Sequence, residues 1–188
     1  RKPMPREQLR LEVSAGIRGR GPNNRPRLRR GRPVSFDVQA ASLSTADLWR
    51  LKLIGEMLDR PRTALAIRII AQADRNDRGS QAGGLIVYDQ GQAELKRYPP
   101  DERMGDQSYL PSAEMLRDAA GSLGWFVGHF DEEQRRQEEV GPTDAELELA
   151  RRKNLPGLVL TSLPDGKVNA AYFNTDGRVV DLGEIDLE

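Results

Sequence analysis

The chain has 188 residues, enough for one domain with an extension and a sizeable core, and its formal net charge is zero. It contains no cysteine, which excludes disulfides, thiolate zinc sites, iron–sulfur clusters and a cysteine nucleophile. No apolar run approaches the roughly 20 residues of a membrane-spanning helix and no signal-peptide pattern is visible, so we expect a cytoplasmic chain without a transmembrane segment.

The first 33 residues are strongly basic. They hold eleven of the 29 basic residues and two of the 29 acidic ones, so they carry a net charge of +9 and the remaining 155 residues carry −9. The stretch "GIRGRGPNNRPRLRRGRP" is almost without apolar residues and cannot by itself offset the entropy of folding. We therefore predict an extended arm over residues 1–33 that is ordered on a partner, and one globular domain over residues 34–188. Inside the arm, "QLRLEV" alternates polar and apolar residues and predicts one strand. The expected partner-binding residues are Arg18, Arg20, Arg25, Arg27, Arg29, Arg30 and Arg32.

Two helices are predicted at the start of the globular domain. The segment "STADLWRLKLIGEMLDR" has apolar residues at helical spacing, Ser44 to cap it and Pro61 to end it. A second helix is predicted over residues 63–75, with Leu65, Ile69 and Ile70 facing inward.

The rest of the chain mixes strands with short helices. "GGLIVYD" and "QAELKRY", separated by Gln90 and Gly91, predict a β-hairpin. "PSAEMLRDAAG" predicts a short helix, and "LGWFVGHF" predicts a strand buried on both faces. Thr143 and Glu146 have the spacing of a capping box, which predicts a helix to about Lys153. Three strands follow over "PGLVLTS", "KVNAAYF" and "RVVDLGE". The fold class is therefore α/β, with helices flanking one mixed central sheet.

This order of elements resembles the JAB/MPN (JAMM) family over roughly residues 45–188. The matching segments are "SQAGGLIVYD" at the first strand, "GWFVGHF" at the strand that runs into the family's His-x-His-Pro turn, and "PTDAEL" at the helix start. The segment "LPGLVLTSLPDGKVNAAYF" follows much as the family closes its sheet. The family contains metal-dependent isopeptidases and inactive scaffolding relatives, so the resemblance implies one of these two kinds of protein.

Most of the family's functional residues are replaced in this chain. Gln81 stands near the place of the catalytic glutamate, and Val127 stands where the first ligand histidine is expected. His129 matches the second histidine, Thr143 replaces the serine, and Glu146 replaces the ligand aspartate. A hydrolytic zinc centre needs about three protein ligands, a water and a general base. Valine has no lone pair for zinc and glutamine accepts no proton at neutral pH. We therefore expect no catalytic residue, no bound metal and no cofactor.

Simpler structural roles also account for the residues that remain. His129 is interpreted as a hydrogen-bonded histidine at a strand end, and Glu146 as the third residue of the capping box. No G-x-S-x-G segment is present to supply the nucleophile of a serine triad.

Three functions remain open from the sequence. The preferred one is a catalytically silent JAB/MPN-like adaptor subunit, a pseudoenzyme that docks onto other protein subunits through its basic arm. The alternatives are a metal-dependent isopeptidase or peptidase with an atypical site, and a nucleic-acid-associated protein that binds phosphates through the arm. Because the predicted helices and strands lie in residues 45–188, removal of residues 1–33 is expected to leave a folded body.

Overall fold

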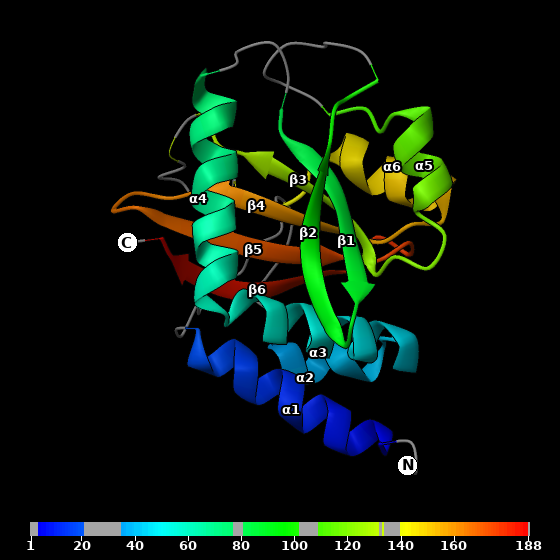
Figure 1. Cartoon of the computed structure of the whole chain (residues 1–188). Coiled ribbons are helices and arrows are strands. Elements are labelled where there is room, and N and C mark those ends of the chain that lie inside the picture. Colours follow the sequence, from blue (N-terminus) through cyan, green and yellow to red (C-terminus); the bar gives the residue numbers. More distant parts are fainter. Residues whose placement is uncertain are drawn as a thin grey trace.

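The structure is a computed structural model that describes residues 4–20, 35–76, 81–101, 109–131, 133 and 140–187. Its strands are β1 (Gly83–Asp89), β2 (Gln92–Tyr98), β3 (Gly124–His129), β4 (Gly157–Ser162), β5 (Lys167–Phe173) and β6 (Val179–Asp186). They form one sheet in the order β2-β1-β3-β4-β5-β6 (Figure 1). Neighbouring strands are antiparallel except for β3 and β4, which are parallel. The predicted α/β class with one mixed sheet is therefore confirmed.

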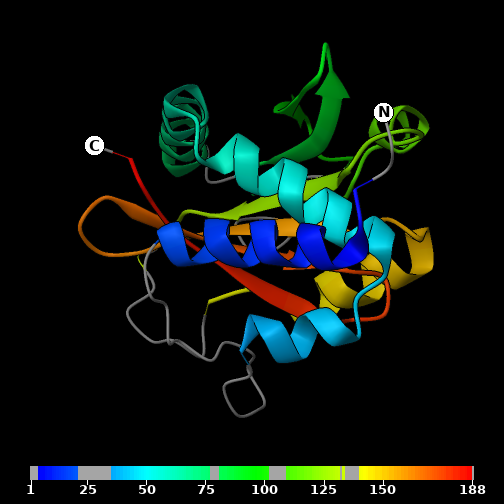
Figure 2. The ribbon, with the colours of Figure 1, turned by 90° about the horizontal axis from the view of Figure 1, so that it is seen from below.

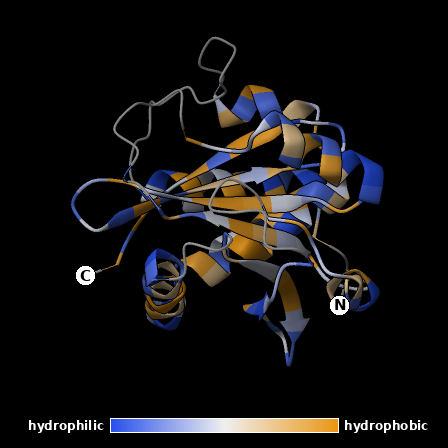
Figure 3. Cartoon of the chain, turned by 90° about the horizontal axis from the view of Figure 1, so that it is seen from above, coloured by the Kyte–Doolittle hydropathy of each residue, from blue (hydrophilic) through white to orange (hydrophobic). Residues whose placement is uncertain are grey.

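Helices cover both faces of this sheet. They are α1 (Arg6–Gly19), α2 (Phe36–Ala41), α3 (Thr45–Leu58), α4 (Pro61–Asn76), α5 (Ala113–Asp118) and α6 (Asp144–Lys153). Side chains of a strand alternate between the two faces, so the sheet separates two buried clusters. Phe126 of β3 packs with residues of α1, α3 and α4, whereas Trp125 and Val127 pack with residues of α5 and α6. The strand β3 is thus buried on both faces, as predicted, and hydrophobic residues gather along the strands (Figure 3).

Two hairpin turns have the backbone geometry that their residues favour. Gln90 and Gly91 both have positive φ, of 47° and 82°, which is the backbone that a two-residue hairpin with right-handed twist requires. Asp165 and Gly166 repeat this geometry between β4 and β5, with φ of 64° and 68°. The predicted hairpin of β1 and β2 and the three predicted C-terminal strands are confirmed.

Local caps also agree with the predictions. The Ser44 side chain accepts a hydrogen bond from the Asp47 amide at 3.0 Å, and the Asp47 carboxylate accepts one from the Ser44 amide at 3.2 Å. Thr143 and Glu146 form the same reciprocal pair at the start of α6. Such boxes satisfy amides that the first turn of a helix leaves without partners.

The N-terminal segment departs from the prediction. Residues 6–19, which include the predicted strand "QLRLEV", form the helix α1, which packs against α3 (Figure 2). Leu9 and Val13, one helical turn apart, are buried in the core. The alternation that suggested a strand also contains this helical spacing, and burial against α3 decides in favour of the helix. The remaining part of the predicted arm, residues 21–33, lies outside the described residues.

Helix α4 includes the predicted residues 63–75 and extends from Pro61 to Asn76, but it presents a different face to the core. Ile70 is buried as predicted, whereas Leu65 and Ile69 are 48% and 55% exposed, and Ile67 is buried in their place. The segment "ALAIRIIA" has apolar residues all around the helix, so the helical period alone does not determine which stripe turns inward. The inward prediction for Leu65 and Ile69 is therefore wrong. In the part of the chain that is described, no helix is long and apolar enough to cross a bilayer.

Candidate functional site

Polar residues of β3, of β4 and of the segment just before β1 lie where β3 ends. In the pairing of β3 with β4, His129 lies opposite Thr161. In the pairing of β3 with β1, Val127 lies opposite Gly83, and the Gly128 amide donates to the Ala82 carbonyl at 2.8 Å. Continuing this register places Gln81 across from His129. Because side chains alternate along a strand, Gln81, His129 and Thr161 belong to the face covered by α5 and α6.

The capping box of α6 also holds the histidine. The Nε2 atom of His129 lies 2.7 Å from Oε1 of Glu146, and the two side chains are 12% and 10% exposed. The other carboxylate oxygen, Oε2, accepts the Thr143 amide at 2.7 Å. A carboxylate oxygen accepts hydrogen bonds, so this contact makes Nε2 the donor. The sequence predicts a hydrogen-bonded strand-end histidine and a capping-box glutamate as separate features. In the structure His129 and Glu146 are hydrogen-bonded to each other.

Val127 and Gln81, the other two positions matched to the family's functional residues, have different surroundings. Val127 is completely buried in the cluster formed with Trp125, and it has no atom that can bind a metal. Gln81 is 7% exposed, and its Oε1 atom has no hydrogen-bond partner among the described residues. An unpaired buried carbonyl of this kind costs roughly 1–3 kcal/mol.

These residues do not fit the zinc centre that the family resemblance implies. His129 and Glu146 supply two of the roughly three ligands such a centre needs, and both oxygens of Glu146 are already bonded within the chain. Within the described segments, no group of three or more His, Asp or Glu side chains is placed to hold a metal ion. The amide of Gln81 cannot act as the general base of hydrolysis.

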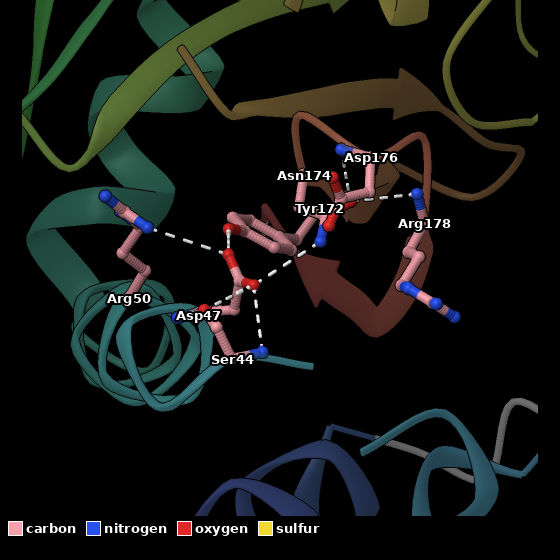
Figure 4. A network of polar contacts seen from close by, with 7 residues as sticks. All are labelled: Ser44, Asp47, Arg50, Tyr172, Asn174, Asp176 and Arg178. Carbon is pink, nitrogen blue, oxygen red and sulfur yellow. Dashed lines mark hydrogen bonds and ion pairs between the residues drawn. The ribbon is translucent and has the colours of Figure 1, made fainter. Parts of the chain in front are cut away.

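A second polar cluster, which the sequence did not predict, surrounds Asp47 (Figure 4). One carboxylate oxygen accepts the Tyr172 hydroxyl at 2.7 Å, and the other accepts the Ser44 hydroxyl at 2.7 Å and the Asn174 amide at 3.4 Å. An Arg50 nitrogen lies 3.6 Å from the first oxygen. The spacing of Ser44 and Asp47 is the one local sign of this cluster in the sequence. Tyr172 is 125 residues away from Asp47, so no local pattern indicates its contact.

The environment of Asp47 favours its charged form. Burial by itself raises the pKa of this carboxyl group, but the hydrogen bonds from Ser44, Tyr172 and Asn174 outweigh burial and hold the pKa below its ordinary value. Burial, with the negative charge of Asp47 next to it, raises the pKa of the Tyr172 hydroxyl. Every oxygen of Asp47 is occupied by groups of the chain, so this cluster connects α3 to the end of β5 and offers no open position for a ligand.

The predicted arginine residues have different environments. Arg18 is exposed near the end of α1. The Arg20 side chain is 8% exposed and is bound within the chain, to the Leu182 carbonyl at 2.7 Å and to Asp59 at 2.7 Å. Arg20 therefore anchors α1 to β6 and α3, and its predicted role in partner binding stays a prediction. The other predicted arginines, Arg25, Arg27, Arg29, Arg30 and Arg32, lie outside the described residues.

Comparison of the sequence with known protein families and with curated proteins finds no match.

Proposed function

We propose that this chain is a non-catalytic JAB/MPN-like adaptor subunit of a larger protein assembly. The observation that carries the proposal is the closed pair of His129 and Glu146, in which the only histidine of the chain and its neighbouring carboxylate bind each other. In a metallohydrolase these groups would be directed at the metal and its water. Here their hydrogen bond connects the end of β3 to the first turn of α6.

The order of elements supports the relation to the JAB/MPN fold. A hairpin of β1 and β2 precedes β3, which ends at His129, and α6 begins at a capping box before the final antiparallel strands. Gln81, His129 and Glu146 come from the segments that the resemblance assigned to the catalytic region. Their residue types favour a structural role for that region.

Docking is assigned to the basic segment that follows α1. Five arginines lie between residues 21 and 33, while the body of the chain is acidic. Arginine forks bind carboxylates with two parallel hydrogen bonds, and Gly, Pro and Asn suit a backbone that follows a partner's surface. We infer a protein partner with an acidic surface for this segment.

The catalytic part of the proposal is tested with zinc. After equilibration of the full chain with zinc ions, we expect no stoichiometric metal by elemental analysis and no cleavage of a ubiquitin-like conjugate. His129→Ala should leave both results unchanged. About one zinc per chain, lost in His129→Ala and accompanied by cleavage, would overturn the proposal and favour the metal-dependent isopeptidase.

The docking part is tested with a variant in which Arg25, Arg27, Arg29, Arg30 and Arg32 are all replaced by Gln. This variant keeps the length of the chain and α1 intact. We expect it to be lost from the native protein assembly. Retention in the assembly, together with loss of salt-dependent binding to generic DNA or RNA, would instead favour the nucleic-acid-associated protein.

A further inference from the structure

The outward side of α4 carries two large apolar residues, and its exposed charged residues are all positive. We define the α4 face as the exposed residues between the two ends of the helix, Arg62, Leu65, Arg68, Ile69, Gln72 and Arg75. All exposed charged residues of this helix are arginines, since Asp74 is buried. Leu65 and Ile69 lie one helical turn apart and form one apolar patch. Arg62 at the start of this face pairs with Glu94 of β2 at 2.9 Å. The outer side of a solvated helix usually carries both signs of charge and few large apolar residues, so the rest of this face calls for an explanation.

A cavity of about 230 Å³ adjoins this face, between α4 and the turn that joins β4 to β5. In Figure 1 that turn projects past the side of α4. Among the residues that the structure describes, three cationic ones line the cavity, namely Arg68, Arg75 and Lys167, and none of the lining residues is acidic. The polar groups of Gln72 and Ser162 and the apolar side chains of Ala71, Leu163, Val168 and Leu187 complete the wall.

Both arginines of the cavity donate hydrogen bonds to neutral groups. Arg75 donates to the Phe130 carbonyl at 3.0 Å and to the Ser162 hydroxyl at 3.2 Å. Arg68 donates to the Leu187 carbonyl at 3.4 Å. These bonds orient the guanidinium groups without neutralising their charge. Lys167 lies 3.7 Å from Glu184, which is a loose ion pair.

The chemistry of the cavity suits a carboxylate on an aliphatic stem. Two guanidinium groups and an ammonium attract the carboxylate, and the apolar wall accepts the stem. Arg68 lies three residues after Leu65 and next to Ile69, on the same stripe of the helix. A partner helix with its carboxylate at Arg68 would therefore place an apolar side chain, one turn from that carboxylate, on Leu65 and Ile69.

We propose that the α4 face and its cavity bind an acidic amphipathic segment of a partner protein, with a Glu or Asp side chain in the cavity and an apolar side chain on Leu65 and Ile69. A membrane surface is a poorer match, because helices that lie on membranes present a continuous apolar side. Here the remaining apolar residues of α4, such as Ile67 and Ile70, are buried in the core. The inference rests on the proposed adaptor function and adds to it a docking surface that is distinct from residues 21–33.

The test uses the full chain and a fluorescein-labelled peptide of 12 residues, made of Glu and Leu with the leucines four residues apart. Binding is followed by fluorescence anisotropy. We expect Arg68→Glu to weaken binding about tenfold or more, and Ile69→Ser to weaken it several-fold. Both residues are exposed, so neither change should unfold the chain. The matched control is Arg152→Glu on α6, on the other side of the sheet, which should bind as the wild type does.

Three outcomes would overturn the inference. Equal weakening by Arg68→Glu and Arg152→Glu would mean that the peptide responds only to net charge. Binding to vesicles of phosphatidylcholine and phosphatidylserine without binding to the peptide would assign the face to a membrane. Self-association abolished by Arg68→Glu, with no peptide binding, would assign it to a second copy of the chain. Failure of the proposed function can be told apart from failure of this inference. Zinc-dependent cleavage would refute the proposed function, whereas peptide binding is measured in a separate experiment without zinc.

Discussion

Single residues with several partners hold distant elements of this molecule together. Asp47 at the start of α3 connects to Tyr172 and Asn174 at the end of β5, and Arg20 connects α1 to β6 and α3. A buried charge is tolerated when it is fully hydrogen-bonded, and removing its partners leaves a costly unpaired group. These residues are therefore expected to matter for stability more than exposed charges do.

Asp47→Asn tests this expectation. An amide cannot accept all the hydrogen bonds that the carboxylate accepts, so we expect a loss of about 1–3 kcal/mol in the free energy of unfolding at neutral pH. Because the folded-state pKa of Asp47 is lowered from its ordinary value of 3.8, its contribution is present above about pH 3.8 and is lost as the pH falls through the folded-state pKa.

Urea unfolding of the wild type and of Asp47→Asn at several pH values measures this contribution. The gap in stability between the two proteins should narrow as the medium becomes more acidic than pH 3.8. Asp89→Asn, at the exposed last residue of β1, should change little and serves as the control. A gap that stays constant down to low pH would show that the charge of Asp47 has no stabilising role.

At the scale of elements, α1 is the clearest departure from the sequence prediction. It lies in the strongly basic segment, yet one side of it is part of the core through Leu9 and Val13. Its charged residues are on the outside, where Arg10 pairs with Glu7 at 2.6 Å and with Asp37 of α2 at 3.1 Å. A high local density of arginine therefore does not prevent folding when the remaining residues keep a helical apolar stripe.

Leu9→Ala and Leu11→Ala form a matched pair on α1. Leu9 is fully buried and Leu11 is 54% exposed, although both substitutions remove the same atoms. We expect Leu9→Ala to cost about 2–4 kcal/mol, because it loses burial and leaves a cavity, and Leu11→Ala to cost well under about 1 kcal/mol. Chemical denaturation of the two variants gives both values. Equal effects would mean that α1 is not packed as described.

At the scale of the whole molecule, the basic segment divides into a folded part and a part that lies outside the described residues. The original expectation that residues 1–33 are dispensable for folding conflicts with the burial of Leu9 and Val13 and with the bonds of Arg20. A chain that begins at residue 21 would expose the side of α3 that α1 covers.

We therefore predict that truncation of residues 1–20 lowers the Tm by roughly 10 °C or more, because it removes several buried side chains at once. The variant with Arg25, Arg27, Arg29, Arg30 and Arg32 replaced by Gln should unfold at nearly the wild-type Tm. Calorimetry of the two proteins compares them directly. A truncated chain as stable as the full chain would restore the view that the globular body is complete without its N-terminal segment.

Features that depend on residues close together in the chain were predictable from the sequence. The hairpin at Gln90 and Gly91, the helix cap at Ser44 and the capping box at Thr143 all arise from interactions within a few residues. Packing between elements determines which side of α4 is buried, places α1 in the core and brings His129 to Glu146. The contact of Tyr172 with Asp47 joins residues 125 positions apart. Such choices depend on packing between distant segments, and no local propensity specifies that packing.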